Sequence, residues 1–148
     1  MNASSAGRVV DILLVEDDPG DELITREAFA DNKIKNTLHV ARDGQEGLDF
    51  LYRRGVHADA PTPDLILLDL NLPKYDGREL LEAIKSDEDL CHIPVVVLTT
   101  SSAEEDILRS YKLHANAYVT KPVDLDQFMK AVREIDEFFV QVVRLPQP

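Results

Sequence analysis

The stretch Leu65-Ile66-Leu67-Leu68-Asp69 places four apolar residues in a row and ends on an acid. Two runs of the same kind are Ile12-Leu13-Leu14-Val15 and Val95-Val96-Val97-Leu98. Continuous rather than alternating apolar residues are typical of strands covered on both faces, as in the middle of a parallel sheet. We therefore predict five strands, over Val9 to Val15, Thr37 to Ala41, Leu65 to Leu68, Val95 to Leu98 and Ala117 to Val119.

The segments between these runs space their apolar residues as one face of a helix does. These residues are Leu23, Ile24 and Ala28; Leu48, Leu51 and Tyr52; Leu80, Leu81 and Ile84; and Ile107, Leu108 and Tyr111. Gly55 follows the second group and predicts the end of that helix. Strict alternation of strand and helix within 148 residues predicts an α/β fold built on one open, doubly wound parallel sheet.

A longer apolar stripe near the end of the chain predicts an extended C-terminal helix. It runs from Leu125 through Ile135 to Val143 and widens at Phe138-Phe139-Val140. Two interpretations stay open: the widened part contacts another chain, or it covers the core of its own chain. We divide the chain into a disordered N-terminus (1–8), one folded domain (9–135) and a C-terminal helix extension with its tail (136–148).

Composition excludes several classes of function. Twenty-eight acidic side chains oppose 16 basic ones, and the resulting net charge of −12 disfavours nucleic acids and anionic membranes as partners. No apolar run is long enough to span a bilayer, and the first residues contain no export signal, so we expect a cytoplasmic protein. The single cysteine, Cys91, excludes an internal disulfide and a cysteine-based zinc site.

Polar side chains follow four of the predicted strands. Glu16 and Asp17 come after the first strand, Asp69 after the third, Thr99 after the fourth and Lys121 after the fifth. The carboxyl ends of parallel strands meet at one edge of the sheet, where such folds bind ligands. Carboxylates brought together there repel one another unless a cation intervenes. Oxygen ligands without His or Cys favour Mg²⁺.

Phosphoryl transfer to a carboxylate requires at least a metal ion, an aspartate and a lysine at one edge. The aspartate attacks, while the metal and the ammonium neutralise the phosphoryl oxygens. The sequence contains no Gly-x-x-x-x-Gly-Lys-Ser/Thr loop, so we expect the phosphoryl donor to be another protein or a small phosphorylated molecule.

The set Glu16-Asp17, Asp69, Thr99 and Lys121-Pro122 resembles the receiver domain of two-component response regulators. The resemblance runs from about Val10 to Ile135. It implies a flavodoxin-like receiver fold with strand order 2-1-3-4-5, and it assigns the receiver domain to residues 9–135. The acidic pair is Glu-Asp, where Asp-Asp is commoner in the family.

The resemblance also implies roles for the residues around the phosphoryl group. Asp69 matches the phosphoacceptor, and Thr99 and Lys121 match the residues that bind the phosphoryl oxygens. Thr99 and Tyr118 together match the switch pair, in which the aromatic side chain changes rotamer on phosphorylation.

A metal site is implied in the same way. Glu16 and Asp17 resemble the acidic pair that holds Mg²⁺, and Asp69 and the backbone carbonyl of Asn71 resemble the remaining protein ligands. No cofactor other than Mg²⁺ is implied.

A narrower resemblance is to the small stand-alone regulators of bacterial phytochrome histidine kinases. It rests on Leu98-Thr99-Thr100-Ser101, on the stretch Ser110 to Tyr118, and on Val142-Val143-Arg144-Leu145-Pro146. It implies a red-light-sensing histidine kinase as phosphoryl donor and a homodimer formed through the last helix.

The leading hypothesis is a phosphorylation-dependent signalling switch rather than an enzyme. Only self-phosphorylation and autodephosphorylation are expected of it, and it would signal through protein contacts without an output domain. An alternative is a phosphohydrolase that passes through the same aspartyl-phosphate, although such enzymes carry a second acid where Asn71 stands. A flavin-carrying module on the same fold is opposed by the acidic cluster at the ligand edge.

Overall fold

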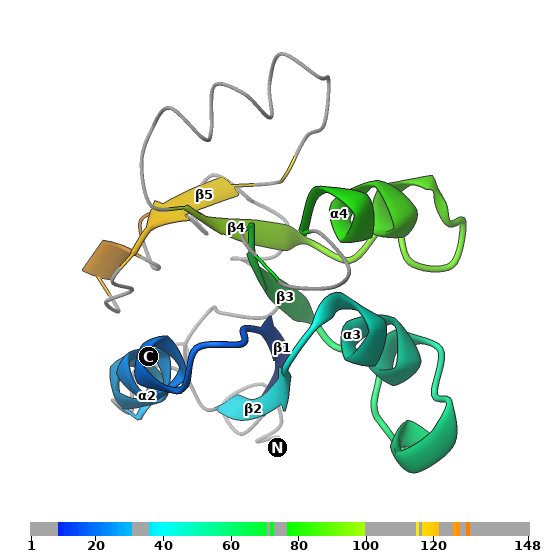
Figure 1. Cartoon of the computed structure of the whole chain (residues 1–148), viewed down its shortest axis with the longest axis horizontal. Coiled ribbons are helices and arrows are strands. Elements are labelled where there is room, and N and C mark those ends of the chain that lie inside the picture. Colours follow the sequence, from blue (N-terminus) through cyan, green and yellow to red (C-terminus); the bar gives the residue numbers. More distant parts are fainter. Residues whose placement is uncertain are drawn as a thin grey trace, which may run out of the picture.

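A five-stranded parallel sheet forms the centre of the protein (Figure 1). The structure is a computed structural model that describes residues 9–30, 36–70, 72, 77–99, 115, 117–121, 126–127 and 130. The strands are β1 (Val10–Val15), β2 (Asn36–Ala41), β3 (Leu65–Asp69), β4 (Val95–Thr99) and β5 (Ala117–Thr120). Their order, β2-β1-β3-β4-β5, confirms the predicted doubly wound α/β fold.

Helices cover both faces of this sheet. They are α2 (Pro19–Phe29), α3 (Gly44–Leu51) and α4 (Gly77–Ser86). Figure 1 shows α2 on one face and α3 with α4 on the other. Ile12 and Leu14 belong to the core cluster that contains Phe29 of α2, whereas Leu13 and Val15 belong to the cluster on the opposite face.

This two-sided covering explains the continuous apolar runs. All five residues of β3 and all five of β4 are buried, so no position in either strand faces water. Burying one Leu or Ile side chain contributes roughly 1.5–3 kcal/mol, so these strands contribute substantially to stability. Each of the two strands also extends one residue past its predicted end, so that Asp69 and Thr99 belong to the sheet.

The start of α2 lies close to the end of β1 and is held by a side-chain cap. Asp18 accepts hydrogen bonds from the backbone N–H groups of Gly20 at 2.7 Å and Asp21 at 3.3 Å. Pro19 takes the first helical position, where its missing N–H costs nothing. The cap therefore fixes where the first helical turn sits relative to the carboxyl edge of the sheet.

The predicted end of the second helix is wrong. Helix α3 ends at Leu51, and Arg53 closes it in the left-handed conformation, with a φ of 55°; Gly55 is also left-handed, at a φ of 58°, but lies beyond this helix end. The N–H of Arg54 donates to the carbonyl of Asp49 at 2.8 Å, which is the bond expected of such a helix end. Gly55 instead starts a short 3-10 helix, η1 (Gly55–His57). Local backbone hydrogen bonding outweighs the preference for glycine at this position.

Several expectations fall outside the described residues. They are the disordered N-terminus (1–8), the helix predicted around Ile107 and Tyr111, and the C-terminal extension (136–148). The last helix is described only at residues 126, 127 and 130. Within the described part of the chain, no helix is both long and apolar enough to cross a membrane.

Candidate functional site

Parallel pairing brings the ends of four strands to one edge of the sheet. Asp69 pairs with Leu98, and Thr99 pairs with Thr120, so the last residues of β3, β4 and β5 lie level with one another. The backbone N–H of Lys121 donates to the carbonyl of Thr99 at 2.8 Å and extends this pairing by one step. Glu16 continues β1 in the same way through a 2.9 Å bond to the carbonyl of Ala41.

Three acids meet at this edge, as the sequence predicts. One carboxylate oxygen each from Glu16, Asp17 and Asp69 lies within 4.8 Å of the others. Glu16 is fully buried and Asp69 is 2% exposed, whereas Asp17 is open to solvent. Buried carboxylates this close repel one another, so the arrangement favours a bound proton or cation.

Glu16 has fewer hydrogen bonds than its burial would lead one to expect. Its Oε2 accepts a long hydrogen bond from the N–H of Asp18 at 3.3 Å. Its buried Oε1 accepts no hydrogen bond from any residue that the structure describes, although the Lys121 ammonium lies 3.0 Å away. Burial, and after it the hydrogen bond and charge of Asp69, outweigh the lowering effect of Lys121 and raise the pKa of Glu16 to about 8. A buried carboxylate oxygen that has an ion pair but no hydrogen bond, and that lies among other carboxylates, fits a hard divalent cation as a further partner.

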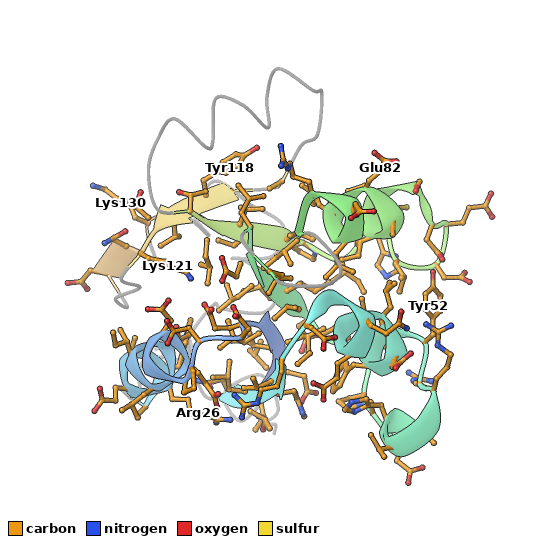
Figure 2. The ribbon with its side chains drawn as sticks, viewed as in Figure 1. Arg26, Tyr52, Glu82, Tyr118, Lys121 and Lys130 are labelled. Carbon is orange, nitrogen blue, oxygen red and sulfur yellow. The ribbon has the colours of Figure 1, made fainter. Side chains whose placement is uncertain are left out.

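Lys121 lies between β5 and α2 and is paired with three carboxylates (Figure 2). Its Nζ is 3.0 Å from Oε1 of Glu16, 3.0 Å from Oδ2 of Asp21 and 3.0 Å from Oδ2 of Asp69. Burial opposes the charge of Lys121, but the hydrogen bonds to Asp21 and Asp69 and the ion pair with Glu16 outweigh it and raise its pKa above the ordinary value. The lysine is therefore charged and held beside Asp69.

The remaining predicted site residues are placed as follows. Thr99 is 1% exposed at the end of β4. Tyr118 is half-buried in β5, and its hydroxyl oxygen accepts a 3.4 Å hydrogen bond from the N–H of Ala115. Asn71 lies outside the described residues.

Two residues of this edge are not singled out by the sequence. Asp21 contacts Lys121 from the first turn of α2, but an acid there looks like a helix-dipole residue. Gly77 begins α4 so close to the site that an added Cβ would lie 2.6 Å from the carbonyl oxygens of Asp69 and Leu70. Only the packing of α2 and α4 against the sheet reveals these two contacts.

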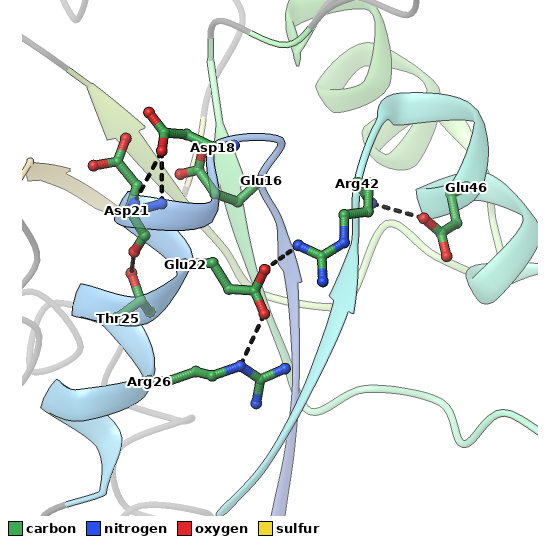
Figure 3. Close-up of polar contacts among 9 residues, drawn as sticks. Glu16, Asp18, Asp21, Glu22, Thr25, Arg26, Arg42 and Glu46 are labelled. Atoms are coloured by element: carbon green, nitrogen blue, oxygen red, sulfur yellow. Dashed lines mark hydrogen bonds and ion pairs between the residues drawn. The ribbon is translucent and has the colours of Figure 1, made fainter.

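A second charged cluster is centred on Glu22, the residue after Asp21 in α2 (Figure 3). Glu22 is buried, at 8% exposure, and forms ion pairs with Arg42 and, at 2.9 Å, with Arg26. The hydrogen bond from Arg42 lowers the pKa of Glu22 despite its burial. This carboxylate is fully paired, which identifies the cluster as a link between α2 and the end of β2.

Comparison with known proteins identifies relatives that match most of the chain. The sequence model described as the response regulator receiver domain matches residues 12–133. The response regulator Rcp1 of Synechocystis is 47% identical over 135 residues, which cover 91% of this chain and 92% of Rcp1.

Solved structures of similar proteins share the fold. The bacteriophytochrome response regulator AtBRR has 46% identity and a TM-score of 0.83, covering 87% of this chain and 94% of its own. The Mn²⁺-bound form of Rcp1 has 46% identity and a TM-score of 0.72, covering 93% and 99%. The phosphorylated cyanobacterial phytochrome response regulator RcpA has 47% identity and a TM-score of 0.74, covering 95% and 100%.

Proposed function

This chain belongs to the response regulator receiver domain family, and we propose that it is a signalling switch that accepts a phosphoryl group on Asp69. The observation that supports this function is the meeting of Glu16, Asp17 and Asp69 within 4.8 Å, with Lys121 3.0 Å from the Asp69 carboxylate. The predicted family is confirmed by the match to residues 12–133.

Asp69 is the proposed nucleophile. One of its carboxylate oxygens attacks the phosphorus of a phosphohistidine, the N–P bond breaks, and the imidazole leaves with the bonding electron pair. Lys121 supplies positive charge beside the oxygen that attacks. The buried hydroxyl of Thr99 donates to a phosphoryl oxygen once the group is attached. Asp69 then carries about −1.5 to −2 charge, and this new charge drives the switch.

Mg²⁺ is the proposed cofactor, held by Glu16, Asp17 and Asp69, with the Asn71 carbonyl as a further predicted ligand. When bound, it neutralises charge on the acceptor and the incoming phosphoryl group. The donor set supports a hard cation because all three side chains offer oxygen and the buried Oε1 of Glu16 accepts no hydrogen bond from the described residues. A Mn²⁺-bound structure of the relative Rcp1 is consistent with this choice.

The output is a change in protein contacts rather than turnover of a metabolite. The Thr99 hydroxyl moves toward the phosphoryl group, and Tyr118 turns inward after giving up its contact with the Ala115 N–H. A differential stabilisation of a few kcal/mol suffices to shift such a two-state population. Dimerisation through the last helix stays a prediction, because that segment lies outside the described residues.

The proposed phosphoryl donor is a phytochrome-type histidine kinase in the cytoplasm. Support comes from the relatives AtBRR and RcpA, whose names describe phytochrome response regulators at 46% and 47% identity over most of the chain. The test is to measure phosphotransfer from such a kinase to this chain in two light conditions. We expect transfer to be faster in one condition than in the other.

The acceptor site is tested with acetyl phosphate and Mg²⁺, followed by intact-mass measurement of the full chain. We expect the unmodified protein to gain one phosphate and Asp69→Asn to gain none. Asp18→Asn is the matched control, since it removes an exposed acid that caps α2 without being part of the site. Labelling of Asp69→Asn would contradict the assignment, and rapid multiple-turnover hydrolysis would favour a phosphohydrolase.

A further inference from the structure

The family motif accounts for two of the three carboxylates around Lys121. Glu16 and Asp69 belong to the acid cluster, whereas Asp21 does not: the described group within 4.8 Å is Glu16, Asp17 and Asp69. Asp21 nevertheless accepts a hydrogen bond from Lys121 at 3.0 Å, as short as the bond that Asp69 accepts. The ammonium has three N–H groups, so Asp21 occupies one third of its donor capacity.

A divalent cation at the acid cluster changes this balance. The cation and Lys121 would compete for the carboxylates of Glu16 and Asp69, and two positive charges close to each other repel. Asp21 lies outside the cluster, so a cation there leaves its contact with Lys121 in place. On the basis of the proposed function, we infer that Asp21 is a positioning residue that keeps the Lys121 ammonium beside Asp69 while the metal is bound.

The local structure of α2 suits Asp21 to this task. The cap formed by Asp18 holds the backbone N–H of Asp21, and the Thr25 hydroxyl donates to its carbonyl at 2.9 Å. Its carboxylate is therefore presented from a rigid helical turn rather than from a loop. Lys121 reaches it from β5 across 100 positions in sequence. The contact joins the first helix to the last described strand at the site itself.

Asp21 could also stabilise α2, and the test must distinguish this structural role from the positioning of Lys121. An acid in the first turn of a helix stabilises that helix by interacting with the backbone dipole. Asp18→Asn is the matched control, because it removes one charge from the same turn, and asparagine remains a good N-cap. Figure 3 shows Asp18 and Asp21 side by side at this end of α2.

The direct test observes the Lys121 ammonium by ¹H–¹⁵N NMR on the full chain. Lysine ammonium protons are visible when hydrogen bonds slow their exchange with water, and Lys121→Arg assigns the signal by its loss. We expect the signal in unmodified protein and in Asp18→Asn, both without Mg²⁺ and at saturating Mg²⁺. In Asp21→Asn it should persist without Mg²⁺, where Glu16 and Asp69 still hold the lysine, and vanish with Mg²⁺.

Labelling by acetyl phosphate at saturating Mg²⁺ is the second readout. Asp21→Asn should slow labelling of Asp69 roughly 3–10-fold, the size expected for one partly exposed charge-assisted contact. Asp21→Glu should restore part of the rate, and Asp21→Asn should have no further effect in Lys121→Gln.

Two results would overturn the inference: an Asp21→Asn signal that survives Mg²⁺, or equal losses in Asp18→Asn and Asp21→Asn. If the unmodified chain takes up no phosphate, the proposed function fails. The NMR measurement still decides the role of Asp21 in that case.

Discussion

Two buried glutamates, Glu16 and Glu22, lie six residues apart and respond to burial in opposite ways (Figure 3). Burial raises the pKa of Glu16 to about 8. The pKa of Glu22 is lowered, because the hydrogen bond from Arg42 outweighs its desolvation. The two residues share a chemistry but differ in burial and in partners: Glu16 is fully enclosed at 0% exposure, whereas Glu22 keeps 8% and has two guanidinium partners.

The two acids differ in the number of positively charged partners. Glu16 shares one ammonium, Lys121, with Asp21 and Asp69, whereas Glu22 alone receives two guanidinium groups, from Arg26 and Arg42. The first cluster has more carboxylates than positive groups among the described residues, so a proton or a cation would offset its charge, while the Glu22 carboxylate already has two positive partners. This contrast separates the proposed cation site from an ion-pair cluster that links α2 to the end of β2.

The largest expected effect is on stability against pH in the absence of divalent cations. Folding raises the pKa of Glu16 from about 4.5 to about 8, so the folded state binds a proton more tightly than the unfolded state. The free energy of unfolding should therefore fall as pH rises from about 5 to 8, by up to about 1.4 kcal/mol per pH unit. Urea titrations in EDTA would measure this slope.

Glu16→Gln is the reference for that measurement and should have a flatter profile. A profile of equal slope in both proteins would contradict the assignment. Glu22 should affect stability in a different pH range. Folding lowers its pKa, so its stabilising contribution is lost only as pH falls below about 4.5.

A smaller but more specific effect concerns metal affinity. Glu16→Gln removes a charged oxygen ligand and should weaken Mg²⁺ or Mn²⁺ binding by at least roughly 10–100-fold, the loss seen even for residues behind the ligands. Isothermal titration calorimetry of the full chain with Mn²⁺ would measure it. Glu22→Gln makes the same chemical change outside the acid cluster and should leave the affinity unchanged; a comparable loss there would remove the distinction between the two clusters.

The smallest expected effect is the stability cost of opening the second cluster. Glu22→Gln weakens charge-assisted hydrogen bonds to Arg42 and Arg26, and should lower the free energy of unfolding by about 1–3 kcal/mol. Urea unfolding at pH 7 would measure this, and the cost should be the same with and without Mg²⁺. Arg26→Gln, at a side chain 47% exposed, should cost only about 0.3–0.5 kcal/mol. A stabilised Glu22→Gln protein would show that the pairing does not repay its desolvation.

Much of the fold and of the candidate site is predictable because its signal is local. The apolar runs of β1, β3 and β4 mark strands buried on both faces, and the polar residue after each run marks the ligand edge. Glu16, Asp69 and Lys121 were predicted from these positions, and the structure brings them within contact. Their catalytic and metal-binding roles stay predictions until the variants are measured.

Other features have no local signal. Arg53 closes α3 with left-handed backbone although Gly55 is two residues away, because the hydrogen bonds to Asp49 and Phe50 form there. Gly77 must lack a Cβ because α4 starts against the carbonyl oxygens of Asp69 and Leu70. Neither requirement is visible until the backbone segments are packed together.

The sequence by itself determined which residues form strands and which polar side chains follow them, because apolar periodicity and strand ends are properties of neighbouring positions. Only the tertiary structure decided which charges meet. Asp21 reaches Lys121 and Glu22 reaches Arg42 because α2 packs against one face of the sheet at one particular depth. Asp21 and Lys121 are 100 positions apart in sequence, so only this packing brings their charged groups to 3.0 Å. The interaction energy of two charges depends on that distance.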